Sequence, residues 1–568
     1  MASRGMAERL LEWKLIGRAF TGRVRAPFVR IGRSLRAFVE PAADRLLVAP
    51  QDLRTADPTV ATDIYAGVFV FSGQIVECNG HSPFELVPPG EDWARVLHGF
   101  GWLRHLRAAD TATARSNARI LVDDWLRITE HPPIAWEPEV VARRTMAWLA
   151  QSPMILAEAD QAFYHRFLAG LTRQFRWLRA RWGEEPTGLP RLKVALAVLA
   201  TATAVDGFRR HIKLASRRLD EELKRQILPD GGHIGRNPVT ILEVLIDLLP
   251  VRQTLAARGH PVSPVILGAI DRMMPMLRFF RHGDGAFTLF NGATTTPTDL
   301  VATVLAYDDA QGRPHGNAAH SGYQRLEAEK SVVVMDCGVP PPPEFARSAH
   351  AGTLAFELSS ATARFVVNCG APFRPAPDWR RVARSTAAHS TLVVDDHSSA
   401  TIRDAGVLAD LLGPILLGGP RSVPVDRVEA DGAVSVTASH DGYAAAYGVL
   451  HQRTLKLSAD GNSLDGRDRV EPVEGSAGDV AFVIRFHLHP SVKVGRLGDH
   501  GVVLIGNGGE GWEFTCDDVA PTIEDSVHLA DLHGVRRTSQ IVLAVDEAGP
   551  RDIRWRFVRT ARSHARSR

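Results

Sequence analysis

Between about residues 90 and 300, the hydrophobic positions recur at the spacing of an α-helix. In the stretch 160–182 the apolar side chains fall on one face, and arginines fill the other. Similar stripes run through 239–255 and 266–280. Several amphipathic helices joined by short turns, with no strand-like alternation among them, predict helix-on-helix packing such as a bundle or a toroid. Such stripes are the ordinary signature of a core.

After a polar connection at residues 305–324, the period of the hydrophobic pattern changes to two. Short runs rich in β-branched residues, such as KSVVVMDCG and DVAFVIRFHLHP, are separated by clusters of glycine, proline, aspartate and serine. This pattern predicts an antiparallel β-sandwich. In the second run, alternation places Ile484, Phe486 and Leu488 toward the core and His487 on the opposite face.

The change of period divides the chain into domains. At 568 residues the chain is longer than one hydrophobic core normally supports. We predict an α+β multidomain fold: a basic N-terminal segment (1–45), a helical (α/α) domain (46–305), a β-sandwich domain (318–560) and a basic tail (561–568). With 45% hydrophobic and 23% charged residues, the composition is that of a globular protein.

Charge and targeting signals narrow the function classes. A net charge of +3 over the whole chain gives no case for a nucleic-acid-binding protein. No stretch has the roughly 18 uninterrupted apolar residues that span a bilayer, and no secretory signal is visible, so we predict a cytoplasmic location. The basic start fits a peripheral helix on an anionic membrane, or a helix packed on its own domain. Four widely spaced cysteines without CxxC spacing exclude a zinc ribbon and a disulfide-dense scaffold.

One polar turn, LPDGGHIGRNP at 228–238, interrupts the helical half. Its Asp-Gly-Gly sequence lets the backbone reverse between two helices. Asn237 suits the N-cap of the next helix, and Pro238 suits its first turn. His233 and Arg236 place an imidazole beside a permanent cation, a combination suited to an anionic ligand.

Four segments, SGYQRLEAEKSVVVMDCG, SAHAGTLAFELSS, FVVNCGAP and STAAHSTLVVDD, follow in this order after the helical half. Together they resemble the heparinase II/III family of polysaccharide lyases over roughly residues 90–560. The resemblance implies an incomplete (α/α) toroid before a multi-sheet β-sandwich, with a groove between them. It also implies β-elimination on uronate-containing glycans such as glycosaminoglycans, so the expected partner is an anionic polysaccharide or oligosaccharide. Because such enzymes are often periplasmic, the periplasm is the alternative location.

The resemblance also suggests catalytic residues. β-Elimination needs a base for the proton beside the uronate carboxylate, a cation for the developing charge, and an acid for the leaving oxygen. On this basis His233 is the base or acid, Arg236 neutralises the carboxylate, and Tyr443 and His451 support them.

Three positions depart from the family pattern. Thr240 falls where the family has its catalytic tyrosine, Ser348 where it has a histidine, and Gly352 where it has an aspartate. A threonine hydroxyl reaches less far than a phenol, and its proton is far harder to remove. Two hypotheses follow: a lyase with an altered residue set, or a catalytically inactive relative that binds an anionic envelope or capsular glycan.

Further polar groups flank the predicted groove. The predicted substrate-binding residues are Asn237, His282, Asp284, Asn291 and Arg453. For each of them taken alone, capping of a turn or a solvated surface is the competing interpretation.

The resemblance further brings together His350, Asn368 and His389 in the sandwich. Two imidazoles and an amide oxygen would be a weak site for a divalent metal, zinc or calcium, because asparagine supplies no charge. The alternative is that the histidines are hydrogen-bonded within the sheet and organise a loop.

Overall fold

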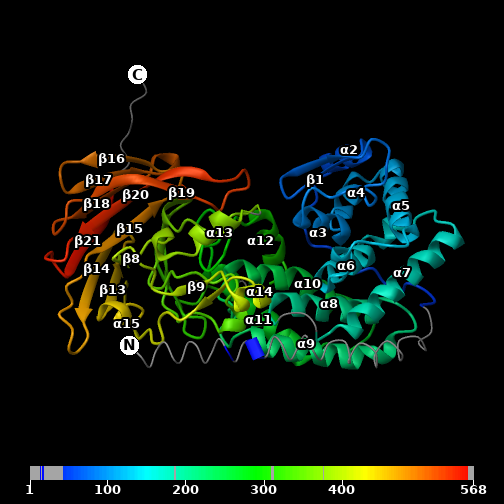
Figure 1. Cartoon of the computed structure of the whole chain (residues 1–568), viewed down its shortest axis with the longest axis horizontal. Coiled ribbons are helices and arrows are strands. Elements are labelled where there is room, and N and C mark those ends of the chain that lie inside the picture. The colour runs from blue at the N-terminus through cyan, green and yellow to red at the C-terminus, as the bar shows by residue number, and fades with distance from the viewer. Residues whose placement is uncertain are drawn as a thin grey trace, which may run out of the picture.

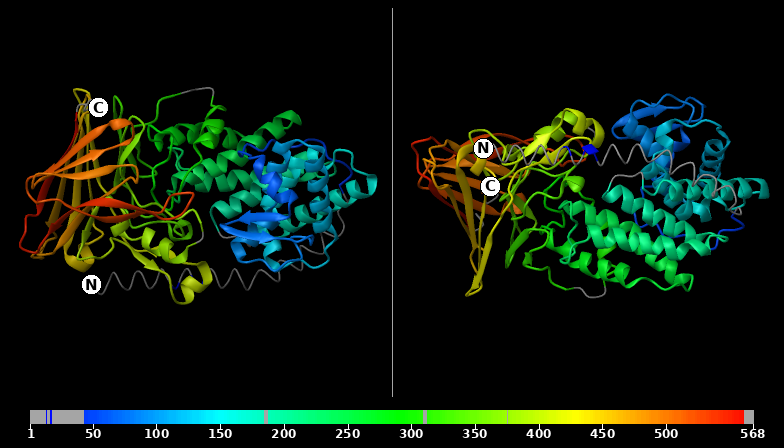
Figure 2. Two further views of the ribbon diagram at one scale, coloured as in Figure 1. Left: turned by 90° about the horizontal axis from the view of Figure 1, so that it is seen from above. Right: turned by 60° about the horizontal axis from the view of Figure 1, so that its bottom comes forward.

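The computed structural model describes residues 13, 16, 17, 43–183, 187–308, 312–374 and 376–560. A helical domain and a β-sandwich lie side by side along the long axis of the molecule (Figure 1). In both views of Figure 2 the orange and red strands stay at one end and the blue and cyan helices at the other. The predicted fold class, a helical domain followed by antiparallel sheets, is confirmed. The N-terminal segment, with its proposed membrane contact, lies outside the described residues apart from residues 13, 16, 17 and 43–45, and the basic tail lies outside them entirely.

The helical domain contains the three amphipathic segments that the sequence predicts, here α7, α10 and α11. Its helices are α2 (Thr59–Tyr65), α3 (Glu91–Gly99), α4 (Leu103–Ala109), α5 (Ala112–Arg127), α6 (Pro138–Ile155), α7 (Gln161–Ala180), α8 (Leu189–Ala204), α9 (Ile212–Gln226), α10 (Pro238–Ala257), α11 (Pro264–Phe279) and α12 (Thr298–Leu305), with the 3-10 turns η1 (Pro133–Trp136) and η2 (Arg209–His211). A hairpin that the sequence reasoning missed, β1 (Val68–Phe71) and β2 (Gln74–Glu77), precedes α3.

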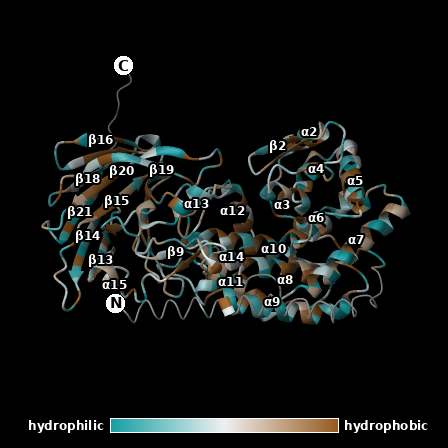
Figure 3. Cartoon of the chain, in the orientation of Figure 1, coloured by the Kyte–Doolittle hydropathy of each residue, from teal (hydrophilic) through white to brown (hydrophobic). Residues whose placement is uncertain are grey.

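Helix α7 illustrates why these segments are helical. The Asp160 side chain accepts a hydrogen bond from the Phe163 backbone N–H at 2.7 Å and so caps the first turn. Leu168, Leu171 and Phe175 of its apolar stripe are buried. Figure 3 shows hydrophobic segments concentrated among the packed helices. The arginine-rich face of α7 points away from this core.

The sandwich consists of two antiparallel sheets. One has the order β11-β12-β13-β14-β21-β18-β17-β16, and the other β19-β20-β15-β7-β6-β5-β4-β3, with β8 paired to β15; β9 and β10 form a separate two-stranded sheet. The strands are β3 (Asn317–Ala318), β4 (Tyr323–Ala328), β5 (Ser331–Asp336), β6 (Phe356–Ser360), β7 (Ala363–Val367), β8 (Leu392–Val394), β9 (Thr401–Arg403), β10 (Ile415–Leu417), β11 (Val425–Ala430), β12 (Ala433–His440), β13 (Val449–Leu457), β14 (Ser463–Pro472), β15 (Phe482–Leu488), β16 (Lys493–Leu497), β17 (Gly501–Ile505), β18 (Gly511–Cys516), β19 (Thr522–His528), β20 (Arg536–Val545) and β21 (Asp552–Thr560). Short helices occupy its connections: η3 (Pro343–Phe345), α13 (Pro377–Ala383), η4 (Thr386–Ala388), α14 (Val407–Leu412), α15 (Ala444–Tyr447) and η5 (Asn507–Gly509).

The core of the sandwich follows the predicted alternation. Ile484, Phe486 and Leu488 of β15 are fully buried between the sheets. His487, on the other face, is also buried, and its Nε2 lies 2.9 Å from the Ala387 carbonyl. The face opposite the core is therefore packed as well at this position.

The two domains share one continuous core. Tyr323 of β4 and Val332 and Val334 of β5 pack in the same buried cluster as the helices α10 and α11. This packing fixes the position of the sandwich against the helical domain. All four cysteines are buried and free. Within the described part of the chain, no helix has the length and apolar character needed to cross a membrane.

Candidate functional site

The Asp-Gly-Gly turn has the architecture that the sequence predicts. Gly231 adopts φ +88°, and a β-carbon there would lie 1.9 Å from the Arg272 carbonyl oxygen, so only glycine fits. Asp230 accepts hydrogen bonds from the Gly232 N–H at 3.0 Å and, across the domain boundary, from the Ser321 N–H at 2.7 Å. The carboxylate braces the turn and ties it to the sandwich.

The beginning of α10 is also as predicted. The Asn237 side-chain oxygen accepts a hydrogen bond from the Val239 N–H at 2.9 Å, and Pro238 is the first residue of the helix. Asn237 is thus the N-cap of α10, as the sequence predicts. Its predicted role in substrate binding has no support in these contacts.

Arg236 is buried, with 7% of its surface exposed, and all of its donor groups are used within the protein. Its backbone adopts φ +61°, which turns the side chain toward the sandwich. The expectation that it points toward a sugar in an open groove is therefore wrong. The guanidinium donates to the carbonyl oxygens of Ser321 (2.8 Å), Gly322 (3.1 Å), Gly338 (3.2 Å) and Val339 (3.0 Å), and to the carboxylate of Asp336.

Asn291 completes the same cluster. Its amide nitrogen donates to Asp336 at 3.1 Å and to the Tyr323 hydroxyl at 2.7 Å, and that hydroxyl donates to the Arg236 carbonyl at 2.6 Å. We call Arg236, Asn291, Tyr323 and Asp336 the interdomain clamp. The clamp uses the polar groups of Asn291 to join the domains, which leaves its amide nitrogen no donor for a ligand.

His233 is enclosed in the same turn. Its Nδ1 accepts a hydrogen bond from the Gly235 N–H at 2.9 Å, so the proton is on Nε2, which donates to Gln226 at 3.1 Å. Burial lowers the pKa of His233 to about 4, so the ring is neutral near pH 7. With both ring nitrogens engaged, His233 has no free position for a substrate proton.

The positions that depart from the family pattern are repacked. A β-carbon on Gly352 would lie 2.6 Å from the His389 ring, so the missing aspartate is what admits this ring. Near Ser348, a β-carbon on Gly292 would lie 2.8 Å from the serine Cβ and 3.4 Å from the Asn237 amide nitrogen. Gly352 thus packs directly against His389, and Gly292 against Ser348.

The predicted metal ligands do not form a ligand set. His350 Nδ1 and His389 Nε2 are 3.1 Å apart and hydrogen-bonded to each other, and His389 Nδ1 donates to the Ser385 carbonyl at 2.7 Å. Asn368 lies in another network, since its amide nitrogen donates to Glu357 at 2.9 Å and its oxygen accepts from the Ser390 N–H at 3.0 Å. Among the described residues, no group of three or more metal-binding side chains converges. These residues do not fit a divalent metal, and the arrangement matches the alternative of sheet histidines that organise a loop.

His282 is buried and Asp284 is half-buried, and each contacts the sandwich. His282 bonds through Nε2 to Glu357 at 2.9 Å and through Nδ1 to the Ser359 hydroxyl at 2.8 Å. Asp284 accepts from the Ala286 N–H at 3.0 Å and pairs with Arg364 at 2.9 Å. Both residues hold the turn after α11 against the sandwich.

Tyr443, His451 and Arg453 lie inside the sandwich. The Tyr443 hydroxyl donates to the Leu392 carbonyl at 3.1 Å, and burial raises the pKa of this phenol far above its usual value. His451 Nε2 lies 2.7 Å from Asp468, and Arg453 binds the same carboxylate with two donors at 2.8 and 3.0 Å. Burial also lowers the pKa of His451. These three residues are structural contacts of the core.

The predicted site residues are thus divided among the clamp, the turn around His233, the His282–Glu357 cluster, the histidine pair and the core of the sandwich. None of them lines the cavity of about 50 Å³ in the helical domain. Its charged lining residues are Asp52, Arg54, Glu139, Arg143, Lys193 and Asp247. Most of these charges are paired, as in Arg54 with Asp247 at 2.8 Å and Lys193 with Glu139 at 3.0 Å.

Sequence reasoning missed a groove that combines arginines with tryptophans at the far end of the helical domain. Its lining residues are Pro133, Trp136, Glu137, Pro138, Arg173, Trp177 and Arg181. Arginines recurring along α7 beside Trp177 were the available signal, and the sequence analysis assigned them no role.

Fold and site together define a helical domain joined to a β-sandwich, with the expected catalytic groups in internal contacts. A family model for the heparinase II/III-like C-terminal domain matches residues 310–556. FtsZ-localized protein C of Caulobacter vibrioides is 32% identical over 561 residues, which cover 96% of this chain and 96% of that protein. The chain belongs to the heparinase II/III-like family.

Solved structures agree on the fold. Heparinase III has a TM-score of 0.65 at 13% identity, covering 86% of this chain and 79% of that chain. Heparan sulfate lyase HepC of Pedobacter heparinus has a TM-score of 0.60 at 15% identity, covering 95% and 89%. At these identities the likeness extends to the fold alone.

Proposed function

We propose that this chain is a binding protein of the cell-division site that keeps the lyase scaffold without lyase catalysis. The observation that carries the proposal is the state of Arg236. The cation expected to neutralise a uronate carboxylate has all its donors committed to the interdomain clamp. A lyase without that charge would lose the main stabilisation of its transition state.

The relative of matching length supports the proposed location. That protein is named for its localisation with FtsZ, and the two chains align over nearly their whole lengths. Such end-to-end similarity favours a shared place of action, which agrees with the cytoplasmic prediction. An anionic envelope glycan remains a candidate ligand, since family members of this fold include heparan sulfate lyases.

The alternative is a lyase that uses another residue set, and the fold similarity to heparan sulfate lyases favours it. Purified protein incubated with heparin, heparan sulfate, alginate and other uronans separates the two, because β-elimination creates an unsaturated uronate that absorbs ultraviolet light. We expect no absorbance increase above buffer. A turnover signal with any of these glycans would establish the lyase instead.

A fluorescent-protein fusion expressed in the host cells tests the location. We expect a band at the division plane that assembles and disappears with FtsZ. The matched control is the fusion after depletion of FtsZ, in which the band should disperse. A uniform or peripheral distribution in dividing cells would contradict the proposed site of action.

A further inference from the structure

The groove on α6 and α7 lies far from the domain junction. It has a volume of about 420 Å³, and its walls are η1, the start of α6 and the middle and end of α7. Trp136 and Trp177 form its floor, with ring centroids 4.9 Å apart. Pro133 and Pro138 flank it. In Figure 1, α6 and α7 lie at the opposite end of the molecule from the sandwich.

Guanidinium groups cover the tryptophan rings. Arg173 lies over Trp136 at 4.3 Å from the ring centroid, and Arg181 lies over Trp177 at 3.0 Å. A guanidinium stacked on a ring is held flat, with its N–H donors directed outward around its edge. This arrangement preorganises the donors of Arg173 for a planar carboxylate.

The positive charge of Arg173 is not neutralised by the carboxylate that lines the groove. Glu137 is bound by Arg95, whose Nε and Nη2 donate to its two oxygens at 2.9 and 3.2 Å. In the described part of the chain, Arg173 has no ion pair within 4.0 Å, and it is exposed. Its guanidinium is therefore available to an external anion.

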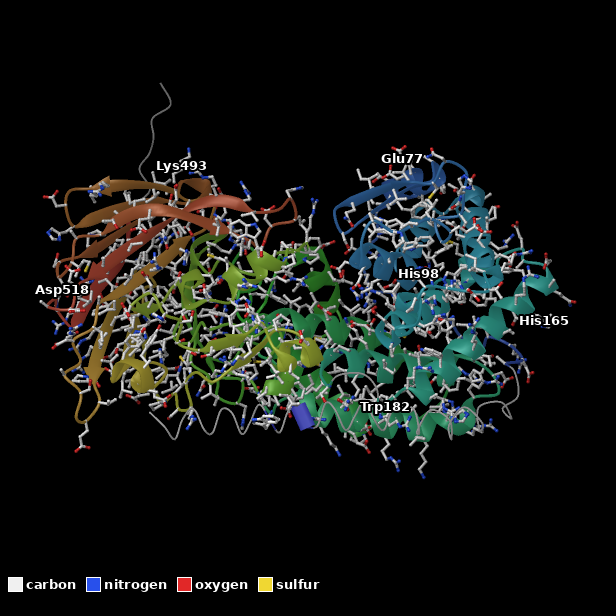
Figure 4. The ribbon with its side chains drawn as sticks, viewed as in Figure 1. Glu77, His98, His165, Trp182, Lys493 and Asp518 are labelled. Atoms are coloured by element: carbon white, nitrogen blue, oxygen red, sulfur yellow. The ribbon has the colours of Figure 1, made fainter. Side chains whose placement is uncertain are left out.

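A second arginine, Arg144, lies near the same Trp136 ring as Arg173. Arg144 is completely buried; its guanidinium lies 4.2 Å from the Trp125 centroid and 5.4 Å from the Trp136 centroid. Its bonds go to neutral oxygens, including the carbonyl of His98, a residue labelled in Figure 4, at 3.0 Å. Its Nη2 has no hydrogen-bond partner. Burial and the nearby charge of Arg173 lower the pKa of Arg144 to about 9. Because its hydrogen-bond partners are neutral oxygens, Arg144 adds positive charge behind the groove.

From this geometry we infer that the groove is a docking site for an acidic, proline-containing peptide segment of a protein partner. The stacked arginine supplies the carboxylate contact, and the prolines and tryptophan edges supply an apolar wall for an extended chain. The inference deepens the proposed function, because it names the kind of partner that a non-cleaving member of the family would bind.

Two other occupants fit less well. A uronate glycan would need open tryptophan faces for its sugar rings, and these faces are covered by guanidinium groups. The chain's own terminal segments are basic: residues 1–42 contain nine arginines and lysines against three glutamates, and residues 561–568 contain three arginines and no acid. Like charge disfavours both segments in this groove.

A suitable probe places a carboxylate within reach of Arg173 in an extended, proline-containing chain. Three repeats of Glu-Pro-Thr-Pro carry one glutamate in every four residues, and the prolines give the chain a low-entropy extended form.

The test is binding of this fluorescein-labelled peptide to the full chain by fluorescence anisotropy. We expect saturable binding that weakens as salt is raised, and no binding of the matched Gln-Pro-Thr-Pro peptide. The substitution Arg173→Glu should weaken binding at least about tenfold, because it removes a charge-assisted contact and adds repulsion. Arg173→Lys should recover only part of it, since lysine lacks the planar fork.

Arg209→Glu is the control, because Arg209 is an exposed arginine on η2 of the same domain. It should leave binding unchanged. Equal effects of both substitutions, or no saturable binding of the peptide, would overturn the inference. Competition by heparin oligosaccharides that also depends on Arg173 would assign the groove to glycans instead. Neither result depends on lyase activity or on location, so failure of the groove is distinguishable from failure of the proposed function.

Discussion

Replacing Arg236 with methionine is expected to lower the free energy of unfolding by about 3–5 kcal/mol. The substitution keeps an unbranched chain of similar length but leaves the carboxylate of Asp336 buried without its cation, and four carbonyl oxygens lose a donor. Removing one partner of a buried ion pair is costly because the remaining charge is neither solvated nor paired. Urea denaturation followed by far-ultraviolet circular dichroism measures the change.

The matched control is Arg537→Met. Arg537 pairs with Asp525 at 2.9 Å, but both side chains are more than four-fifths exposed. An exposed pair contributes less than about 1 kcal/mol, so this variant should unfold like the parent. If Arg236→Met were equally mild, the clamp would not hold the domains together. The sequence-based role of Arg236 in substrate binding would then regain its support.

Local patterns predicted the elements well, because short-range physics determines them. The stripe of α10, its Asn237 cap and the glycine turn before it all depend on residues within a few positions of each other. The alternation of β15 likewise identified its core face. These features needed no knowledge of the rest of the chain.

The candidate site was less predictable, because the direction of each polar side chain depends on distant residues. Arg236 is 100 positions from Asp336, and Asp336 reads in the sequence as an ordinary strand end. His389 fits its place only because Gly352, 37 positions earlier, lacks a side chain. A cluster of polar residues beside a turn has the composition of an active site whether it binds a substrate or braces a domain boundary. Only the partners distinguish the two.

The same reasoning explains why the groove was missed. Arginines on the outer face of α7 fit a solvated helix surface, and Trp136 belongs to a separate short turn 37 residues before Arg173. Their stacking is a tertiary contact. The buried Arg144 gives no sequence signal either, since an arginine within an amphipathic helix is expected to reach solvent.

Replacing Asp468 with asparagine is expected to destabilise the sandwich by about 3–5 kcal/mol near neutral pH. The carboxylate accepts hydrogen bonds from Arg453, His451 and, at 2.8 Å, the Trp555 indole N–H. Arg453 is fully buried, so the neutral amide would leave an unpaired guanidinium in the core. Hydrogen exchange of peptides from β13 and β14, measured by mass spectrometry, reports the stability of this region specifically.

The pH dependence of this effect has a defined sign. Burial raises the pKa of Asp468, but attraction by Arg453 and the hydrogen bonds from His451 and Arg453 outweigh it and hold the pKa well below its usual value. A group with a depressed folded-state pKa stabilises the protein above its unfolded pKa of about 3.9, and this contribution is lost as the pH falls further. The difference in stability between parent and Asp468→Asn should therefore be constant between about pH 5 and 8 and shrink below about pH 4.

Asp465→Asn separates the buried network from a general effect of removing a carboxylate on β14. Asp465 lies on the same strand, pairs with Arg556 and keeps 39% of its side chain exposed, so its replacement should cost less than about 1 kcal/mol. Equal costs for the two variants would show that the Arg453–Asp468 pair contributes no more than a surface pair. The contacts of Asp468 with Arg453 and His451 would then not be explained by stability, and the predicted functional roles of Arg453 and His451 would regain support. A large cost confined to Asp468 would place Arg453 and His451 in the framework of the sandwich, in line with a family member that retains the fold and has lost the chemistry.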